Sequence, residues 1–326
     1  MSSVTPPQRS DNNEPQPWLV ISAHDTGIWK LAYLPDGRRV VTGSDGGTVK
    51  VWNLESGEQE GTSMEHKKGI LDLAVTRDGK NIVSSDVDGK IKVWDVESHE
   101  LVKEWTHPDR YPTIAISPDD QLIAAGAVAI YTMEGRRIKN SIKVGKLGVL
   151  SMCFSPDGNR LACGTRDDMR VYDVDNATLV LEAHQDWVCD VVWSRDGSRL
   201  FSRSADETIR CWNSDTGEQI GRWRTGHANY IRSLSLSSDG SILASASLDH
   251  TIRFWDAATG NSIGQHLQHD KQVNAVCFSP SGESVVSVAG DGKIYSWRVP
   301  WSHSVDNRVR TLIRCTSVFI LIPLSI

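Results

Sequence analysis

Residues 184–212 read HQDWVCDVVWSRDGSRLFSRSADETIRCW and contain one complete copy of a motif from which the fold can be predicted. In order, they contain an apolar run at 188–193, a turn at 195–197, a second run at 200–204, a second turn at 205–207 and a third run at 208–212. Asp and Gly suit the first turn because Asp bonds its own backbone and Gly accepts a positive φ. Alternating β-branched and aromatic residues favour strands. The stretch therefore predicts short strands joined by tight turns.

The same pattern recurs along the chain at intervals of 37 to 43 residues. An aromatic residue ends each third run, at Trp52, Trp94, Tyr131, Tyr172, Trp212, Trp255 and Trp297. A histidine opens six of the units, at His24, His66, His107, His184, His227 and His269, and Gly145 stands at the remaining place. Two residue types that share one period indicate a repeat architecture of seven units.

Composition narrows the class of protein. The chain has 326 residues, a net charge of −6 and 39% hydrophobic residues. That apolar fraction can fill a core and excludes a fully disordered chain. The mildly acidic balance argues against broad phosphate binding, so direct nucleic acid binding is not expected. Tryptophan is in excess, with 12 Trp against 5 Phe and 6 Tyr, and five of the tryptophans end a third run.

Both ends of the chain lie outside the repeats. Residues 1–17 carry four prolines and no apolar run, which predicts a disordered arm without a secretory signal and places the protein in the cytoplasm or nucleus. The tail 301–326 ends in an apolar stretch that is too short to span a bilayer, so no transmembrane segment is expected. This tail could dock on the repeats, touch a membrane surface or be non-native coding sequence.

The repeated motifs resemble those of the WD-repeat β-propeller family from about Trp18 to Trp297. The Trp-Asp pair that names the family occurs at Trp94-Asp95 and Trp255-Asp256. The resemblance implies four-stranded blades arranged radially around a channel. With seven units, the expected fold is an all-β, seven-bladed propeller over residues 18–300.

Closure of the ring can be predicted from the two ends of the repeat array. The last unit ends at Trp297 without an outermost strand, and residues 18–21 form an apolar run that has no earlier unit to join. The N-terminal strand should therefore complete the last blade. A ring closed in this way leaves no open sheet edge at its two ends.

Histidine and aspartate recur 22 residues apart, in the pairs His66 and Asp88, His184 and Asp206, His227 and Asp249, and His269 and Asp291. Two units add a serine two residues before the Asp and a strand tryptophan after it, namely Ser204 with Trp212 and Ser247 with Trp255. Such sets imitate a catalytic triad, but an active site does not recur around a ring. The family resemblance implies instead a buried hydrogen-bond relay from His through Ser and Asp toward Trp, which satisfies buried polar groups.

No catalytic, cofactor or metal site is predicted. The repeat register places the histidines on different blades, away from any single ion. Inner-strand positions that could face a central metal are apolar or small, as in Leu73-Ala74-Val75. A metal-dependent propeller hydrolase therefore ranks last among the hypotheses, and a small-molecule substrate is not expected.

The loops after the histidines differ from unit to unit, which favours a role in recognition. Trp187, Tyr230 and Lys271 lie in these loops, and Trp29, Arg232 and Asn274 lie immediately inward. Trp, Tyr and Arg dominate the energetics of protein interfaces. We therefore predict a partner-binding patch centred on units five and six, near Arg232. The alternative is that Trp187 and Tyr230 pack on neighbouring blades.

The sequence favours a non-catalytic scaffold or adaptor that binds other proteins, whose identity the repeats leave open. One alternative is a substrate-recognition subunit of a ubiquitin ligase or of a chromatin-modifying complex. Co-purification with such subunits would select this alternative, whereas turnover of a lactone or ester with bound metal would select the hydrolase.

Overall fold

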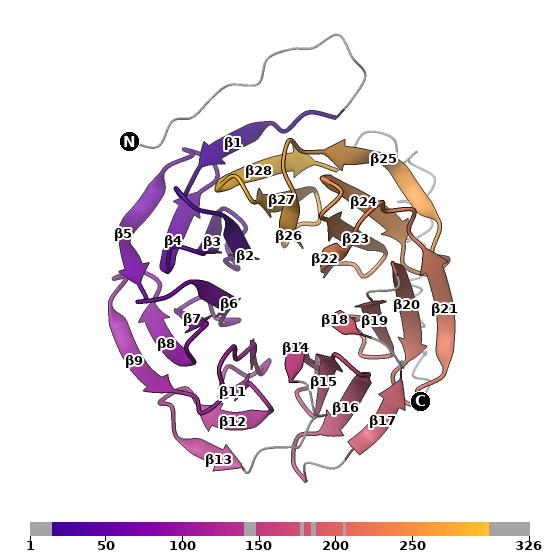
Figure 1. Ribbon diagram of the computed structural model, residues 1–326, viewed down its shortest axis with the longest axis horizontal. Coiled ribbons are helices and arrows are strands. Elements are labelled where there is room, and N and C mark those ends of the chain that lie inside the picture. The colour runs from indigo at the N-terminus through magenta and orange to yellow at the C-terminus, as the bar shows by residue number, and fades with distance from the viewer. Residues whose placement is uncertain (1–14, 140–147, 177–178, 184–186, 205–206, 300–326) are drawn as a thin grey trace, which may run out of the picture.

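The structure is a computed structural model that describes residues 15–139, 148–176, 179–183, 187–204 and 207–299. Over these residues the strands form seven four-stranded antiparallel sheets arranged as blades in a ring (Figure 1). Within the same ranges, no helix has the length and apolarity needed to cross a bilayer. The predicted all-β, seven-bladed propeller is confirmed.

The strands occupy equivalent places in successive blades. The innermost strands are β2 (Ile28–Tyr33), β6 (Ile70–Val75), β10 (Ile114–Ile116), β14 (Val149–Phe154), β18 (Val188–Trp193), β22 (Ile231–Leu236) and β26 (Val273–Phe278). The second strands are β3 (Arg39–Ser44), β7 (Asn81–Asp86), β11 (Leu122–Ala125), β15 (Arg160–Thr165), β19 (Arg199–Ser204), β23 (Ile242–Ser247) and β27 (Ser284–Ala289).

The third and fourth strands complete each blade toward the rim. The third strands are β4 (Thr48–Asn53), β8 (Lys90–Asp95), β12 (Ala129–Thr132), β16 (Met169–Asp173), β20 (Thr208–Asn213), β24 (Thr251–Asp256) and β28 (Lys293–Arg298). The outermost strands are β5 (Gln59–Glu65), β9 (Leu101–Thr106), β13 (Arg137–Lys139), β17 (Leu179–Ala183), β21 (Gln219–Arg224), β25 (Ser262–Gln268) and β1 (Leu19–Ser22).

The turn between first and second strands follows from its Asp and Gly. In the fifth blade, Ser194 Oγ and the backbone N–H of Ser198 donate to Asp196 Oδ1 at 2.6 and 3.1 Å. Gly197 adopts a φ of 72°, which a residue with a Cβ reaches only with strain. The turn therefore reverses the chain at a fixed residue and sets the register of the two strands.

The N-terminal strand closes the ring as predicted. β1 pairs antiparallel with β28, with Leu19 opposite Ser296 and Ser22 opposite Lys293, and Figure 1 shows β1 beside β28. Ile21 is fully buried in the core shared by the last blade and the first. The two ends of the repeat array are thus held together by one sheet.

The apolar core lies between neighbouring blades. The five third-strand tryptophans are all buried: Trp52, Trp94, Trp212, Trp255 and Trp297. Each packs in a cluster with side chains of an adjacent blade, as Trp255 does with Phe201 and Ile209. The tryptophan excess of the sequence is therefore mainly a property of the blade-to-blade core.

The third blade departs most from the repeat. Its strands have only three or four residues, and Tyr131 holds the position of the strand tryptophan. The His107 ring lies 5.9 Å from the Tyr131 ring, edge to face, while His107 Nδ1 accepts a 3.0 Å bond from the backbone N–H of Asp109. This blade retains the histidine, and His107 Nδ1 caps the loop that follows it.

Candidate functional site

The sixth blade contains a complete buried relay. His227 Nδ1 lies 2.8 Å from Asp249 Oδ2, and His227 Nε2 lies 2.8 Å from Ser245 Oγ. Trp255 Nε1 donates to the same Ser245 Oγ at 2.9 Å. The structure thus brings together the predicted His227, Asp249 and Trp255, but the hydroxyl between them belongs to Ser245 and not to the predicted Ser247.

The chemistry of the groups sets the direction of this chain. An indole N–H can only donate and a carboxylate can only accept, so Ser245 Oγ accepts from Trp255 and donates to His227 Nε2, and His227 donates from Nδ1 to Asp249. Burial opposes ionisation of Asp249, but hydrogen bonds from His227 and Thr251 outweigh it and lower the pKa of the Asp249 carboxyl. The relay therefore holds an ionised Asp and satisfies every member.

The relay hydroxyl occupies one register position in the five blades whose third strand carries a tryptophan. It lies ten residues before the strand tryptophan, as Thr42 before Trp52, Ser84 before Trp94, Ser202 before Trp212, Ser245 before Trp255 and Ser287 before Trp297, with indole-to-hydroxyl distances of 2.8 to 3.0 Å. The prediction of Ser204 and Ser247 was wrong, because each lies two residues after the hydroxyl that the indole contacts. Ser247 Oγ instead donates to Asn229 O at 3.0 Å.

The first blade has a relay that the sequence did not reveal. His24 Nε2 lies 2.8 Å from Thr42 Oγ1, and His24 Nδ1 lies 2.9 Å from Thr48 Oγ1. A threonine thus replaces the carboxylate at the second ring nitrogen. The signal that could have found it is the constant interval of 18 residues from the histidine to the hydroxyl.

The predicted pairing of His66 with Asp88 is wrong. His66 Nδ1 lies 3.2 Å from Asp86 Oδ2, at the buried end of β7. Because Asp86 already satisfies the imidazole, Asp88 points outward and forms a 2.7 Å ion pair with Arg110.

The predicted pairing of His269 with Asp291 is also wrong. His269 Nε2 lies 2.8 Å from Ser287 Oγ, while Asp291 Oδ2 accepts a 2.7 Å bond from the Tyr295 hydroxyl. The Tyr295 ring stands edge to face against His269 at 4.8 Å. In this blade the carboxylate therefore bonds to the tyrosine hydroxyl, whereas in the sixth blade the equivalent carboxylate, Asp249, bonds to the imidazole. His184 and Asp206 lie outside the described residues.

Replacing Asp86 by alanine should lower the free energy of unfolding by about 1–3 kcal/mol, because it leaves a buried imidazole N–H without an acceptor. The matched control is Asp88→Ala, which removes a carboxylate of a surface ion pair and should cost less than about 1 kcal/mol. Urea denaturation of both variants measures the difference. A larger loss for Asp88→Ala would contradict the observed relay.

Acid should destabilise the propeller through His269. Burial lowers the pKa of His269 to about 4 from an ordinary value of 6.5. As the pH falls below 6.5 the unfolded chain takes up a proton first, so stability is lost between about pH 6.5 and pH 4. At about 1.4 kcal/mol for each pKa unit, this loss is on the order of 3 kcal/mol.

The test compares the pH dependence of unfolding in His269→Gln with that in His266→Gln, whose side chain is exposed. The slope of unfolding free energy against pH should flatten in the first variant only. Equal slopes in the two variants and the wild type would contradict the assignment to His269.

The loops that follow the histidines place several predicted partner residues on one face of the ring. Trp187 is 47% exposed and Tyr230 is 56% exposed, and Lys271 is also exposed. The Arg166 guanidinium lies over the Trp187 ring at 5.2 Å from its centroid. Neither aromatic ring is buried between blades.

The inward residues divide into two kinds. Arg232 lies over the Trp29 ring at 5.1 Å, and the two side chains meet at the mouth of the channel. Asn274 is only 8% exposed and donates from Nδ2 to Ile28 O at 2.8 Å. Its assignment to the partner surface is corrected, because this amide joins the last blade to the first.

A group of charged residues around the channel was missed from the sequence. Lys30 Nζ forms a 3.0 Å ion pair with Asp72, which accepts the backbone N–H of Ile114 at 2.9 Å. Arg203 is buried and donates to the carbonyl oxygens of Cys189 and Ile231. These contacts join neighbouring inner strands. Among the described residues, no three His, Cys, Asp or Glu side chains meet as they would around a metal ion.

A family model, the WD domain or G-beta repeat, matches residues 16–53, 57–95, 139–173, 176–213, 217–256 and 260–298. The matched segments cover well over half of the chain. They leave out the third blade, whose strands are the shortest.

Known proteins with similar sequences include a mouse periodic tryptophan protein 2 homolog, 35% identical over 61% of this chain and 23% of its own length. The transcription factor unc-37 of Caenorhabditis elegans is 24% identical over 56% of this chain and 30% of its own length. This chain therefore spans less than a third of each relative. Among solved structures, the β-propeller domain of Myceliophteria thermophila Cps50 (Swd1) matches with a TM-score of 0.76 and 16% identity, over 85% of this chain and 97% of that one.

Proposed function

Because this chain belongs to the WD-repeat family, we propose that it is a non-catalytic scaffold or adaptor that recognises another protein through the face carrying its histidine loops. The observation that carries the proposal is the exposure of Trp187 and Tyr230 on a face whose repeated residues are otherwise buried. Trp and Tyr are enriched among the residues that contribute most of the binding energy in protein interfaces. We place this function in the cytoplasm or nucleus.

An arginine packs over each of the two predicted partner-binding tryptophans, Trp187 and Trp29. Arg166 covers Trp187, and Arg232 covers Trp29. A guanidinium over an aromatic face restrains both side chains and reduces the entropy that a partner would have to remove on binding. Arg232 is exposed and forms no ion pair with a carboxylate among the described residues, so its charge can also serve a partner. Lys271 extends the patch toward the last blade.

Replacing Trp187 by alanine and Arg232 by glutamate in one variant should reduce co-purified partners at least about tenfold, since two anchor residues are lost. The matched control is Ile220→Ala, which alters a side chain that is 51% exposed on β21, the outermost strand of the fifth blade. Quantitative mass spectrometry of affinity-purified complexes measures the change. An unchanged set of partners in the double variant would refute the patch.

A second candidate function is recognition of substrates within a chromatin-modifying complex or a ubiquitin ligase. One relative carries the name of a transcription factor, which favours the chromatin assembly. Stable co-purification of chromatin-modifying subunits that survives the Ile220→Ala control and is lost in the double variant would select this function over a general adaptor.

A further inference from the structure

The fifth blade has an arginine at a position where five other blades have a small or aliphatic residue. Arg203 lies opposite Asp190 in the register of β18 and β19, and the residues at the same place are Gly43, Ser85, Gly164, Ala246 and Val288. This position faces the inner strand of the next blade at close range, since a Cβ on Gly43 would lie 2.5 Å from Ile70 Cγ2. The Arg203 side chain therefore extends between β18 and β22, which are neighbouring inner strands at the channel (Figure 1).

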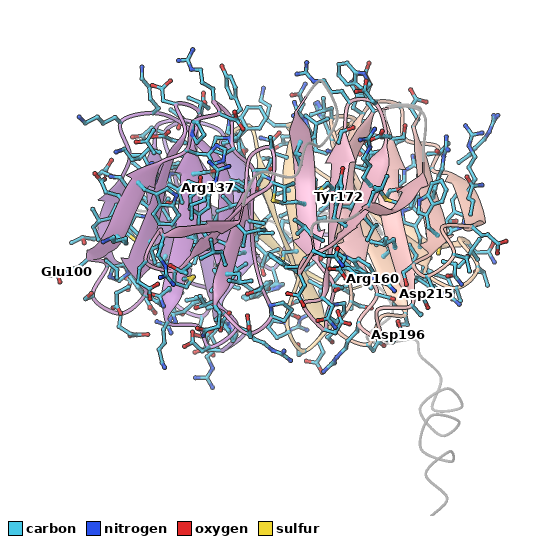
Figure 2. All side chains as sticks on the ribbon, turned by 90° about the horizontal axis from the view of Figure 1, so that it is seen from below. Glu100, Arg137, Arg160, Tyr172, Asp196 and Asp215 are labelled. Atoms are coloured by element: carbon cyan, nitrogen blue, oxygen red, sulfur yellow. The ribbon has the colours of Figure 1, made fainter. Side chains whose placement is uncertain are left out.

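This guanidinium is buried without a carboxylate partner. Arg203 is 7% exposed and donates to the carbonyl oxygens of Ile231 and Cys189, the latter at 3.1 Å. Among the described residues its Nε has no acceptor, and no carboxylate lies within ion-pair distance of it. Arg160, which also crosses between blades, instead forms a 2.9 Å ion pair with Asp215, and Figure 2 labels these two residues close together. Because a buried charge without a counter-charge is costly, an anionic group beside Arg203 would be stabilised.

The Cys189 side chain lies beside this guanidinium. Cys189 is the second residue of β18, at the bulge of that strand, and is partly exposed. Burial lowers the pKa of Arg203, and Cys189 opposes this shift through its charge and through a hydrogen bond. Arg232 has the equivalent place in β22. Burial and the charge of Arg203 lower the pKa of Arg232, and Cys189 opposes this shift as well. One thiol is thus close to two guanidinium groups.

The charge around this thiol is net positive. Asp190 is the carboxylate whose charge also acts on Arg203. It accepts the Ser151 hydroxyl and the backbone N–H of Leu234, each at 2.9 Å, and so joins three inner strands. The two guanidinium groups and this one carboxylate leave one positive charge. Lys30 and Asp72, on the first and second blades, form an ion pair with each other and cancel.

The other four described cysteines do not combine access with positive charge. Cys153 and Cys277 are also partly exposed on inner strands, but burial raises the pKa of Cys153 to about 11 and raises that of Cys277. Cys163 and Cys211 are buried, and burial raises the pKa of both thiols. The thiolate is the reactive form of cysteine, and reactive cysteines lie in electropositive, partly exposed places. Cys189 has such a place.

We propose that Cys189 is a modification site that forms a mixed disulfide with a small acidic disulfide such as glutathione disulfide. The Cys189 thiolate attacks one sulfur of the disulfide, the new S–S bond forms as the old one breaks, and the second sulfur leaves as a thiolate. Cys189 is oxidised, the departing sulfur is reduced, and the proton of the Cys189 thiol goes to solvent.

The two arginines have different parts in this reaction. Arg203 stabilises the attacking thiolate from its buried position. Arg232 is exposed and forms no ion pair within the described part of the chain, so its charge attracts the carboxylates of the incoming disulfide. The site therefore selects acidic disulfides over cationic ones.

The test exposes the full-length native protein to glutathione disulfide, which is acidic, or to cystamine, a cationic disulfide. Mass spectrometry of peptides measures the adduct on each cysteine, and each rate is divided by that of N-acetylcysteine amide with the same disulfide. Cys189 should react with glutathione disulfide at least about tenfold faster than Cys153 or Cys277. Its normalised rate should be lower with cystamine, and salt should reduce this difference because it screens Arg232. Cys189→Ser should remove the fast adduct.

Two variants separate the arginines. At low salt Arg232→Gln should slow the reaction with glutathione disulfide at least about threefold and accelerate that with cystamine. The control Arg224→Gln removes an equal charge from the outermost strand of the fifth blade and should change neither rate. Arg203→Ala introduces the residue that the sixth blade has at this position, Ala246, and should slow the reaction of Cys189 with both disulfides.

A Cys189 rate no higher than those of Cys153 and Cys277 would overturn the proposal. Equal normalised rates with the two disulfides at low salt, or unchanged rates in Arg232→Gln, would overturn the selectivity for acidic disulfides. The rates are measured without any protein partner. Failure of partner recognition through Trp187 and Tyr230 would therefore leave them unchanged.

Discussion

Replacing Ser245 by alanine is expected to lower the free energy of unfolding by about 2–4 kcal/mol. The Ser245 hydroxyl is buried and serves two partners, Trp255 Nε1 and His227 Nε2. Its removal leaves both groups without a partner in the core, and each buried unsatisfied group costs about 1–3 kcal/mol. Urea denaturation, followed by tryptophan fluorescence, measures the loss.

The control for this prediction is Ser247→Ala. Ser247 lies on the same strand and is equally buried, but its hydroxyl donates to the loop carbonyl of Asn229 and accepts from the backbone N–H of Asp249. Its replacement should cost about 1–2 kcal/mol, because the two bonds that are lost join it to backbone groups that are only partly buried. If Ser247→Ala proved the more damaging of the two, the relay would have to run through Ser247.

Removing residues 1–22 is expected to destabilise the whole ring, while removing residues 1–14 should not. The longer deletion takes away β1, exposes the edge of β28 and uncovers the sites of Leu19 and Ile21. Two buried aliphatic side chains correspond to about 3–6 kcal/mol. The exposed edge strand can pair with another molecule.

Melting temperature and sedimentation velocity distinguish the two deletions. The deletion of 1–22 should melt at a lower temperature and form larger species at the same concentration. The deletion of 1–14 keeps every described strand and should behave as the full chain does. A monomeric deletion of 1–22 with an unchanged melting temperature would show that β1 does not close the ring.

The period of the sequence was sufficient to predict the ring and its closure. Each third strand has an aromatic residue one position before its end because that position packs against a neighbouring blade, so one physical requirement recurs seven times. Residues 18–21 could be assigned to the last blade because an apolar run needs a sheet partner, and β28 provides it.

The relay could be predicted in kind but not in register. Ser245 and Ser247 project from the same face of β23, since side chains alternate along a strand. Only the pairing of β23 with β24 decides which hydroxyl the indole reaches: Leu243 lies opposite Trp255, so the diagonal neighbour is Ser245. In the second blade the acid of the relay is Asp86 and not the predicted Asp88. The spacing of the residues alone cannot reveal this difference.

The channel residues could not be placed from the sequence because the inner strands carry a bulge. The register shifts at the second residue of six inner strands, as between Ile28 and Lys30 and between Val273 and Ala275. A bulge re-aims its side chain. It brings Trp29 under Arg232 but turns the Asn274 amide onto the Ile28 carbonyl. The same sequence position therefore serves a surface contact in one blade and a buried bond in another.

The most direct test of recognition through the histidine-loop face is photo-crosslinking from single positions in cells. A benzophenone amino acid would replace Tyr230, 56% exposed on that face, or Val102, 57% exposed on the outer strand β9. We predict covalent adducts with a defined partner from position 230, and their loss when Trp187→Ala and Arg232→Glu are added. Adducts from position 102 alone, or adducts from position 230 that persist in the double variant, would contradict the account.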